Sequence, residues 1–232
     1  SGGLPAMHIV GLPEAAVKES KDRVRSAILN SNFEFPANKI TINLAPADLP
    51  KEGGRYDLAI ALGILAAAEE IPGTLLEKHE FIGELALSGE LRPVRGVLSG
   101  AIQAQNAKRI LIIPNDNAEE ASLCQGAEQK SAESLLQVCA YLRGQAHLEN
   151  IDNLEQPEYL EEHANLSEVR GQAQAKRALE ITAAGKHNLI FIGPPGTGKT
   201  MLASRLPGIL PPMNETEALE SAAIHSISTQ QT

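Results

Sequence analysis

The stretch Gly193-Pro194-Pro195-Gly196-Thr197-Gly198-Lys199-Thr200 fits the pattern G-x-x-x-x-G-K-[ST], a phosphate-binding loop. Gly196 and Gly198 lack a Cβ atom, so backbone N–H groups can surround a polyphosphate at this point. Lys199 can neutralise the β- and γ-phosphates of ATP, and the Thr200 hydroxyl can bind Mg²⁺. We therefore predict that residues 193–200 bind ATP and that Thr200 is the ligand of its Mg²⁺ ion.

The residues on either side of this loop favour the same interpretation. Residues 188–192, Asn-Leu-Ile-Phe-Ile, form a short apolar run that is typical of a buried strand. Residues 201–206 predict a helix, which Pro207 and Gly208 end. A helix that starts directly after the loop brings free N–H donors and positive partial charge to bound phosphates. The alternative is a glycine-rich turn that precedes a lysine by chance, and the two flanks make it the weaker interpretation.

Composition restricts the classes of protein to consider. A chain of 232 residues can form one large domain or two small ones with a sizeable core. The formal net charge of −9 argues against one large basic face that coats nucleic acid, but it leaves open a local basic groove formed on assembly. Cys124 and Cys139 have neither metal-site spacing nor a disulfide framework, which favours a reducing cytoplasm. The sequence predicts neither a membrane span nor a signal peptide at residues 1–13.

Residues 1–143 are expected to form one mixed α/β domain, because helices alternate with strands and a hairpin. Helices are predicted from residue 13, with an apolar stripe that includes Leu29, and at residues 56–70, 97–107 and 131–143. Strands are predicted at residues 7–10, 40–44, 80–87, 91–94 and 109–114, with a hairpin turn at Ser88-Gly89-Glu90. The first helix also has a face with basic and acidic side chains mixed along it: Lys18, Lys21, Arg23, Arg25, Glu19 and Asp22. We interpret this face as solvated and paired at i,i+4 spacing, in preference to a contact with nucleic acid.

Residues 144–167 are interpreted as an acidic linker. From residue 147 to residue 167 there is no Lys or Arg, and the acids have no compact ligand spacing that would indicate a metal cluster: Glu149, Asp152, Glu155, Glu158, Glu161 and Glu162. Residues 169–172, Val-Arg-Gly-Gln, then open a predicted helix that runs to Ala184, just before the strand that precedes the loop. A helix in that place can pack against a bound base.

Residues 168–232 resemble the N-terminal part of a P-loop ATPase domain of the AAA+ superfamily. Residues 169–172 are similar to the segment that contacts adenine there, and residues 193–200 are the superfamily's usual form of the phosphate loop. Residues 201–213 resemble the magnesium-chelatase-like group in particular. The resemblance implies that Val169 and Gly171 contact the nucleotide, together with Pro194, Pro195 and the rest of the loop.

The first half resembles the Lon protease domain, which implies a fold like domain 2 of ribosomal protein S5. Residues 50–54 are similar to the loop before the catalytic serine, residues 83–94 to the hairpin, and residues 109–114 to a core strand. The motif places Arg55 where the serine nucleophile belongs and Leu98 where the lysine base belongs. A protonated guanidinium cannot attack a carbonyl and leucine cannot accept a proton, while Lys51 and Ser99 lie at unmatched positions. We therefore expect no protease activity.

A degenerate Lon-like domain followed by a magnesium-chelatase-like ATPase is the layout of the ComM/YifB family, which residues 11–20 match closely. The resemblance covers essentially the whole chain. It implies a bacterial, cytoplasmic AAA+ ATPase that uses ATP and Mg²⁺, self-associates into a ring, a hexamer by family analogy, and acts as a DNA helicase in branch migration during natural transformation. A chelatase-type ATPase subunit and a non-enzymatic assembly module are the alternatives.

The chain is also expected to be an N-terminal fragment of such a motor. Hydrolysis requires an acid after a second strand, sensor residues and an arginine from a neighbouring subunit. The last carboxylates, Glu215, Glu217 and Glu220, follow a proline-rich turn and not an apolar strand. We therefore expect the catalytic residues to lie beyond Thr232 and the fragment alone to be inactive.

Overall fold

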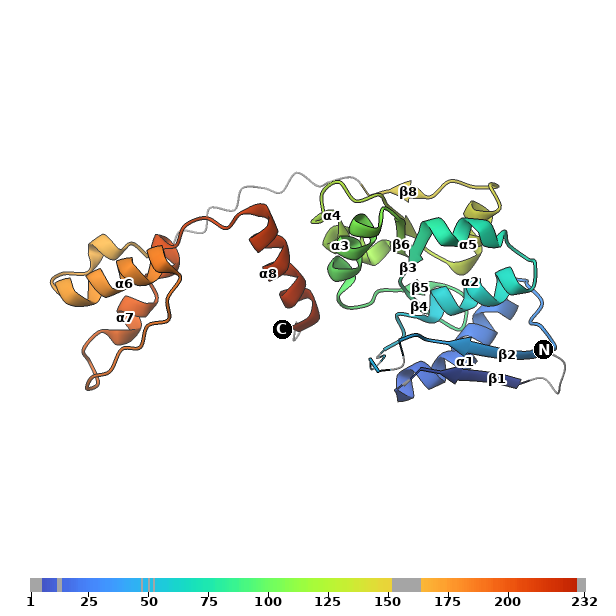
Figure 1. The fold of residues 1–232 in the computed structure, drawn as a ribbon, viewed down its shortest axis with the longest axis horizontal. Helices are drawn as coiled ribbons and strands as arrows, with labels where there is room; N and C mark the ends of the chain where they lie inside the picture. The colour runs from blue at the N-terminus through green and yellow to red at the C-terminus, as the bar shows by residue number, and fades with distance from the viewer. Residues whose placement is uncertain are drawn as a thin grey trace. The chain divides into compact units, whose positions relative to one another are not determined.

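The computed structural model describes residues 6–11, 14–46, 48, 49, 51, 53–151 and 164–228 of the chain (Figure 1). The fold is mixed α/β. Two compact units are present: unit 1 comprises Ser1–Leu154 and Leu219–Thr232, and unit 2 comprises Glu155–Ala218. Each unit is described separately below.

Unit 1 contains all the strands of the described residues and most of the helices. Its strands are β1 (Ala6–Val10), β2 (Lys39–Asn43), β3 (His79–Phe81), β4 (Glu84–Leu85), β5 (Leu91–Arg92), β6 (Ile110–Pro114), β7 (Gln129–Ala132) and β8 (Glu149–Asn150). Its helices are α1 (Ala15–Asn30), α2 (Asp57–Ala67), α3 (Val97–Ala107), α4 (Ala118–Ser122) and α5 (Leu135–Leu142), with 3₁₀ turns η1 (Gly73–Lys78) and η2 (Asn115–Asn117). The last helix, α8 (Glu215–Ser228), belongs to unit 1 from Leu219 onward.

The strands of unit 1 form three small sheets. β1 and β2 pair in parallel, with α1 as the connection between them, and the three elements appear together in blue in Figure 1. The largest sheet has the order β3-β6-β7-β8, in which only β8 runs antiparallel to its neighbour. β4 and β5 form a short antiparallel hairpin.

β6 lies between the two hydrophobic clusters of unit 1. Ile112 is buried in one cluster with side chains of α1, α2 and α5, whereas Leu111 and Ile113 are buried in the other with side chains of α3. Successive side chains of a strand point to opposite faces, so this division follows directly from the alternation along β6. A strand that is buried on both faces has apolar residues at every position, which explains the uninterrupted run Ile110-Leu111-Ile112-Ile113.

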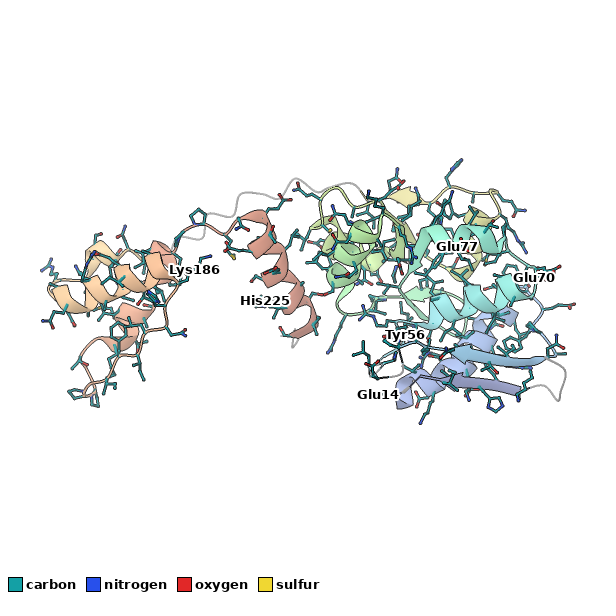
Figure 2. All side chains as sticks on the ribbon, viewed as in Figure 1. Glu14, Tyr56, Glu70, Glu77, Lys186 and His225 are labelled. Carbon is teal, nitrogen blue, oxygen red and sulfur yellow. The ribbon has the colours of Figure 1, made fainter. Side chains whose placement is uncertain are left out.

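The helix α2 is held at both ends by polar contacts. At its start, Asp57 is fully buried and accepts hydrogen bonds from the Ser20 hydroxyl, from Arg23 Nε at 2.6 Å and from Leu85 N at 3.3 Å. The hydrogen bond to Asp57 raises the pKa of the Arg23 guanidinium above its ordinary value. Beyond its end, Arg143 Nη2 lies 3.0 Å from Glu70 Oε2; Figure 2 labels Glu70, and also Tyr56 just before α2.

The two cysteines of unit 1 are buried and form no disulfide. Burial raises the pKa of the Cys139 thiol to about 12, because a thiolate would lose its hydration among the apolar side chains around α5. The Cys139 thiol therefore packs as a small apolar group, whereas Cys124 Sγ donates to Gln105 Oε1 at 3.5 Å.

The structure confirms most predicted elements of the first half, corrects two of them and corrects the burial of one residue. The predicted strand at residues 80–87 is divided into β3 and β4, because the backbone of Gly83 is bonded to the start of α2: Gly83 N donates to Arg55 O and Leu58 N donates to Gly83 O. The predicted helix at residues 131–143 starts only at Leu135, because residues 129–132 pair with β6 as β7. Leu29, placed in the apolar stripe of α1, is 47% exposed.

Unit 2 contains 3₁₀ turn η3 (Leu166–Glu168), α6 (Ala173–Gly185), α7 (Lys199–Ala203), 3₁₀ turn η4 (Pro207–Ile209) and the first residues of α8. The predicted helix after residues 169–172 is confirmed as α6. The predicted strand at residues 188–192 is wrong for this structure: the segment has no strand assignment, and Ile190 and Ile192 are 79% and 89% exposed. A strand needs a ladder partner, and no described residue pairs with this segment.

The acidic linker predicted at residues 144–167 is described only in part. Residues 152–163, and with them Asp152, Glu155, Glu158, Glu161 and Glu162, lie outside the described residues. Over the parts of the chain that the structure does describe, no three His, Cys, Asp or Glu side chains are grouped as a metal site. No helix in those same parts is long and apolar enough to cross a bilayer.

Candidate nucleotide-binding site

The loop at residues 193–200 has the backbone conformation that its glycines permit. Gly196 and Gly198 both have φ of +81°, which places them in the left-handed region. A residue with a Cβ atom is strained there, so the glycines of the pattern are required by the backbone path and not only by the space that a ligand needs. Gly198 is the residue directly before α7, so the helix begins at Lys199.

The polar side chains of the loop bond to the loop itself. Lys199 Nζ donates to the carbonyl oxygens of Gly193 and Pro194, both at 2.8 Å, and Thr197 Oγ1 donates to Pro194 O at 3.0 Å. These bonds hold the ammonium group against the N-terminal half of the loop. Thr200 is exposed at the second position of α7. A cation and a hydroxyl thus stand on successive residues directly after the glycines.

A small apolar cluster packs α7, the helix that follows the loop, against η3 and α6. Leu166, Val169, Leu179 and Leu202 are buried together, so η3, α6 and α7 share one core. The side chain of Val169 is 2% exposed and belongs to this cluster. Gly171, with Gln172 just before α6, is exposed. Contact of Val169 and Gly171 with a nucleotide stays a prediction.

Two polar side chains that the sequence pattern did not single out make contacts at or near the loop. Gln172 Nε2 donates to Thr197 O at 3.0 Å, which joins the segment before α6 directly to the loop. Arg205, after α7, donates from Nε to Asn165 O at 3.1 Å and pairs through Nη2 with Glu168 at 3.0 Å. Gln172 was part of the quoted segment 169–172, so its amide could have been proposed as a loop contact; Arg205 carries no comparable signal.

Glu217, one of the last acids of the chain, is bonded within unit 2. Glu217 pairs with Lys186, which Figure 2 labels, and its carboxylate also accepts a hydrogen bond from Asn214 N. The hydrogen bond from Lys186 lowers the pKa of Glu217, and the same bond raises the pKa of Lys186. The Glu217 carboxylate therefore caps the start of α8 in this structure.

The donor set of the loop fits a nucleotide with its Mg²⁺ ion. Positive-φ glycines turn successive N–H groups toward one side, an arrangement that binds phosphate oxygens. The Lys199 ammonium lies against the same loop, and the Thr200 hydroxyl is a hard oxygen ligand of the kind Mg²⁺ prefers. Bound MgATP would supply a polarised γ-phosphoryl group, while the residues of this chain bind and orient it.

The positions that correspond to a serine–lysine dyad carry other chemistry. Leu98 is fully buried in α3, and its backbone N–H donates to Glu120 Oε1 at 3.0 Å. The half-buried Arg55 donates from Nη2 to Gly96 O at 3.2 Å. Lys51 is 5% exposed, and its ammonium group donates to the carbonyl oxygens of Pro46 and Leu49. No nucleophile or base is present at either matched position.

Comparison with known protein families agrees with this description. Residues 1–117 match the model described as subunit ChlI of magnesium chelatase, and residues 165–232 match the model described as magnesium chelatase, subunit ChlI. The second match includes the whole phosphate loop and the segment before α6.

Comparison with individual proteins gives the same result. The chain is 57% identical over 229 residues to the uncharacterized protein YifB of Salmonella typhimurium and 51% identical over 231 residues to the competence protein ComM of Haemophilus influenzae. Each alignment covers 98% of this chain and 45% of the relative, so the chain spans less than half the length of these proteins. A weaker similarity, 27% over 109 residues, relates 44% of the chain to 13% of the Lon protease of Mycoplasma mobile. The chain therefore belongs to the magnesium-chelatase ChlI-related family that includes YifB and ComM.

Proposed function

We propose that this chain is the ATP-binding part of a magnesium-chelatase-like AAA+ motor. The observation that carries the proposal is the loop at residues 193–200, whose two glycines adopt left-handed conformations directly before Lys199 and Thr200. Gln172 joins this loop to residues 169–172, the segment expected to contact the base. In this proposal the loop N–H groups hold the phosphates, Lys199 neutralises their charge and Thr200 binds Mg²⁺.

We propose three parts for the chain. Residues 1–143 form a Lon-protease-like domain without a catalytic dyad, residues 144–167 a linker, and residues 168–232 the start of the AAA+ domain. The similarity to a Lon protease supports the first assignment, and Arg55 and Leu98 support the absence of peptidase chemistry. Two buried cysteines that form no disulfide suit a cytoplasmic location.

We further propose that the whole protein assembles into a ring, a hexamer by family analogy, and uses ATP to drive branch migration on DNA. The similarity to a protein named for competence supports this choice. The alternative is a motor subunit for metal insertion into a porphyrin, which the name of the family model favours. Unwinding of branched DNA by the full-length protein, set against a porphyrin-binding assay on the same protein, separates the two. A non-enzymatic assembly role for residues 1–143 is compatible with either.

The nucleotide site is tested by replacing Lys199. We expect isothermal titration calorimetry to detect weak binding of MgATP to this chain and Lys199→Ala to abolish it, because the loop then lacks its only side-chain cation. Lys176→Ala, a change on α6 with the same loss of charge, is the matched control and should leave binding unchanged. Equal loss in both variants would mean that overall charge, and not the loop, attracts the nucleotide.

Hydrolysis places a stricter demand on the site than binding does. The transferring phosphoryl group is stabilised by the metal, a positioned water and a cation together, and an arginine finger alone is worth ~10³–10⁵ in rate. We therefore expect no phosphate release above background from this chain. Steady release that Lys199→Ala removes would place the catalytic acid within these 232 residues.

A further inference from the structure

A cavity of about 520 Å³ lies in unit 1, between the loop that precedes α2 and the start of α3. Two arginines and one acid line it, Arg55, Arg95 and Glu84, together with the apolar side chains of Pro93, Val94 and Ile227. Nothing in the proposed nucleotide site uses these residues. The cavity therefore needs an explanation of its own.

The two guanidinium groups have donors to spare. Arg55 uses one, from Nη2 to Gly96 O, and its backbone is fixed because Arg55 O accepts a hydrogen bond from Gly83 N at 3.0 Å. The exposed side chain of Arg95 has no hydrogen bond or ion pair to any residue that the structure describes. A guanidinium carries five N–H donors and stays charged, so the pair can bind both oxygens of one oxyanion.

Glu84 restricts which anion fits. Its carboxylate lies against Gly54, where the Cβ atom of any other residue would come within 2.2 Å of Glu84 Oε2. The cavity thus has two cations and one acid, and the acid accepts hydrogen bonds but repels a highly charged anion. A ligand with one negative charge can pair with Arg55 and Arg95, and an N–H donor beside that charge can bind Glu84. A polyphosphate has no such donor, so its charge would be repelled by Glu84.

The remaining wall is apolar. Ile227 of α8 lies so close to Gly96 that a Cβ atom on Gly96 would be 3.2 Å from Ile227 Cγ1. With Pro93 and Val94, it offers a surface for a hydrocarbon side chain beside the charged groups. Anion, N–H donor and apolar side chain occur together at the C-terminal end of a peptide chain.

We propose that this cavity binds the C-terminal carboxylate of a polypeptide. The terminal carboxylate pairs with Arg55 and Arg95, a main-chain N–H donates to Glu84, and an apolar side chain packs on Pro93, Val94 and Ile227. The proposal goes beyond the proposed ATPase and does not depend on it, since every group belongs to unit 1.

The test is a titration of the ¹⁵N-labelled chain, followed by the backbone amide signals of Gly53, Gly54 and Gly96. The probe is the peptide N-acetyl-Ala-Leu-Leu with a free carboxylate, compared at equal ionic strength with the same peptide as its C-terminal amide. We expect saturable shifts with the acid and about tenfold weaker binding of the amide, which loses charge-assisted hydrogen bonds. Equal shifts with both peptides, or none with either, would overturn the proposal.

Substitutions and two other anions test whether the peptide binds at the arginines of this cavity. Arg95→Gln should weaken binding about tenfold without unfolding, because the exposed side chain has no described partner, and Arg55→Gln should do the same. Arg92→Gln, an exposed arginine on β5 that does not line the cavity, is the control and should bind as the unchanged chain does. Inorganic phosphate and a thymidine oligonucleotide are titrated in parallel. Tighter binding of either than of the peptide, at the same glycines, would make this a phosphate site and refute the assignment.

Discussion

At the scale of single residues, Ser20, Arg23 and Asp57 form a hydrogen-bonded group in unit 1 in which Ser20 and Asp57 are fully buried. Asp57 has no exposed surface, whereas 20% of the Arg23 side chain is exposed. The two charges therefore differ in what they can do when their partner is removed. A carboxylate without exposure cannot recover hydration, but the guanidinium can turn toward solvent.

This asymmetry gives an ordered prediction for two substitutions. Arg23→Gln leaves an uncompensated buried carboxylate and should lower the free energy of unfolding by about 4 kcal/mol. Asp57→Asn keeps the shape and one acceptor oxygen and should cost about 2 kcal/mol. Urea unfolding at pH 7, followed by circular dichroism, measures both, and Arg109→Gln at an exposed ion pair should cost less than about 1 kcal/mol. A larger loss for Asp57→Asn than for Arg23→Gln would contradict the argument.

At the scale of elements, the sequence predicts what local periodicity determines. The apolar run at residues 110–113 forms β6, and the helix predicted at residues 97–107 forms α3. Both could be predicted because the hydrophobic pattern of an element depends on neighbouring residues alone. The wrongly predicted elements are those whose structure depends on residues far away in the sequence. Gly83 interrupts a predicted strand because its backbone bonds to Arg55 and Leu58, and no window of sequence reports that contact.

The start of α5 is a case in which a local signal was present and not used. Ser134 and Gln137 stand three apart, as in a capping box, and the Ser134 side chain accepts a hydrogen bond from Gln137 N at 3.3 Å. The Gln137 side chain accepts in turn from Glu133 N at 2.8 Å. Reading this pair as the helix start would have left residues 129–132 free to be assigned as the strand they form.

The cap predicts a measurable contribution to stability. Ser134→Ala should lower the free energy of unfolding by about 1 kcal/mol, because one backbone donor at the start of α5 loses its acceptor. Ser134→Asp should restore most of the loss, since aspartate caps equally well. The exposed Ser88 provides the control, and Ser88→Ala should be neutral within about 0.5 kcal/mol in the same urea titration. Failure of aspartate to rescue would assign the effect of Ser134→Ala to packing.

At the scale of the whole molecule, the sequence predicts the turn at Gly196 and Gly198 better than the strand expected before it. The pattern requires glycine at these two positions, and both adopt positive φ; phosphate and Mg²⁺ binding by Lys199 and Thr200 stays a prediction. The strand expected at residues 188–192 depends on neighbours that the pattern does not contain, and Ile190 and Ile192 stay exposed without them. The cavity at Arg55 was not predicted, because its lining residues are brought together only by the fold.

The charge of the whole chain gives the last prediction, that it does not bind DNA tightly by itself. It has 20 Lys and Arg against 29 Asp and Glu, and the basic residues of α1 alternate with Glu19 and Asp22. At about 0.01 M salt the screening length is about 30 Å, so a polyanion is repelled by the molecule as a whole and not only at its contact surface. Fluorescence anisotropy with a labelled thymidine oligonucleotide should give a dissociation constant above about 100 µM, weaker than the usual non-specific range.

If the chain does bind the oligonucleotide tightly, the salt dependence of the dissociation constant shows whether phosphate contacts are responsible. Binding through phosphates weakens steeply as salt rises, with a slope that counts the phosphates neutralised. If tight and salt-sensitive binding appears, a variant with Lys18, Lys21 and Arg25 changed to Gln tests the mixed face of α1, and loss of binding there would make that face the DNA contact. Binding that appears only for the full-length assembly would instead place the contact on a surface that the ring creates, as the proposed motor requires.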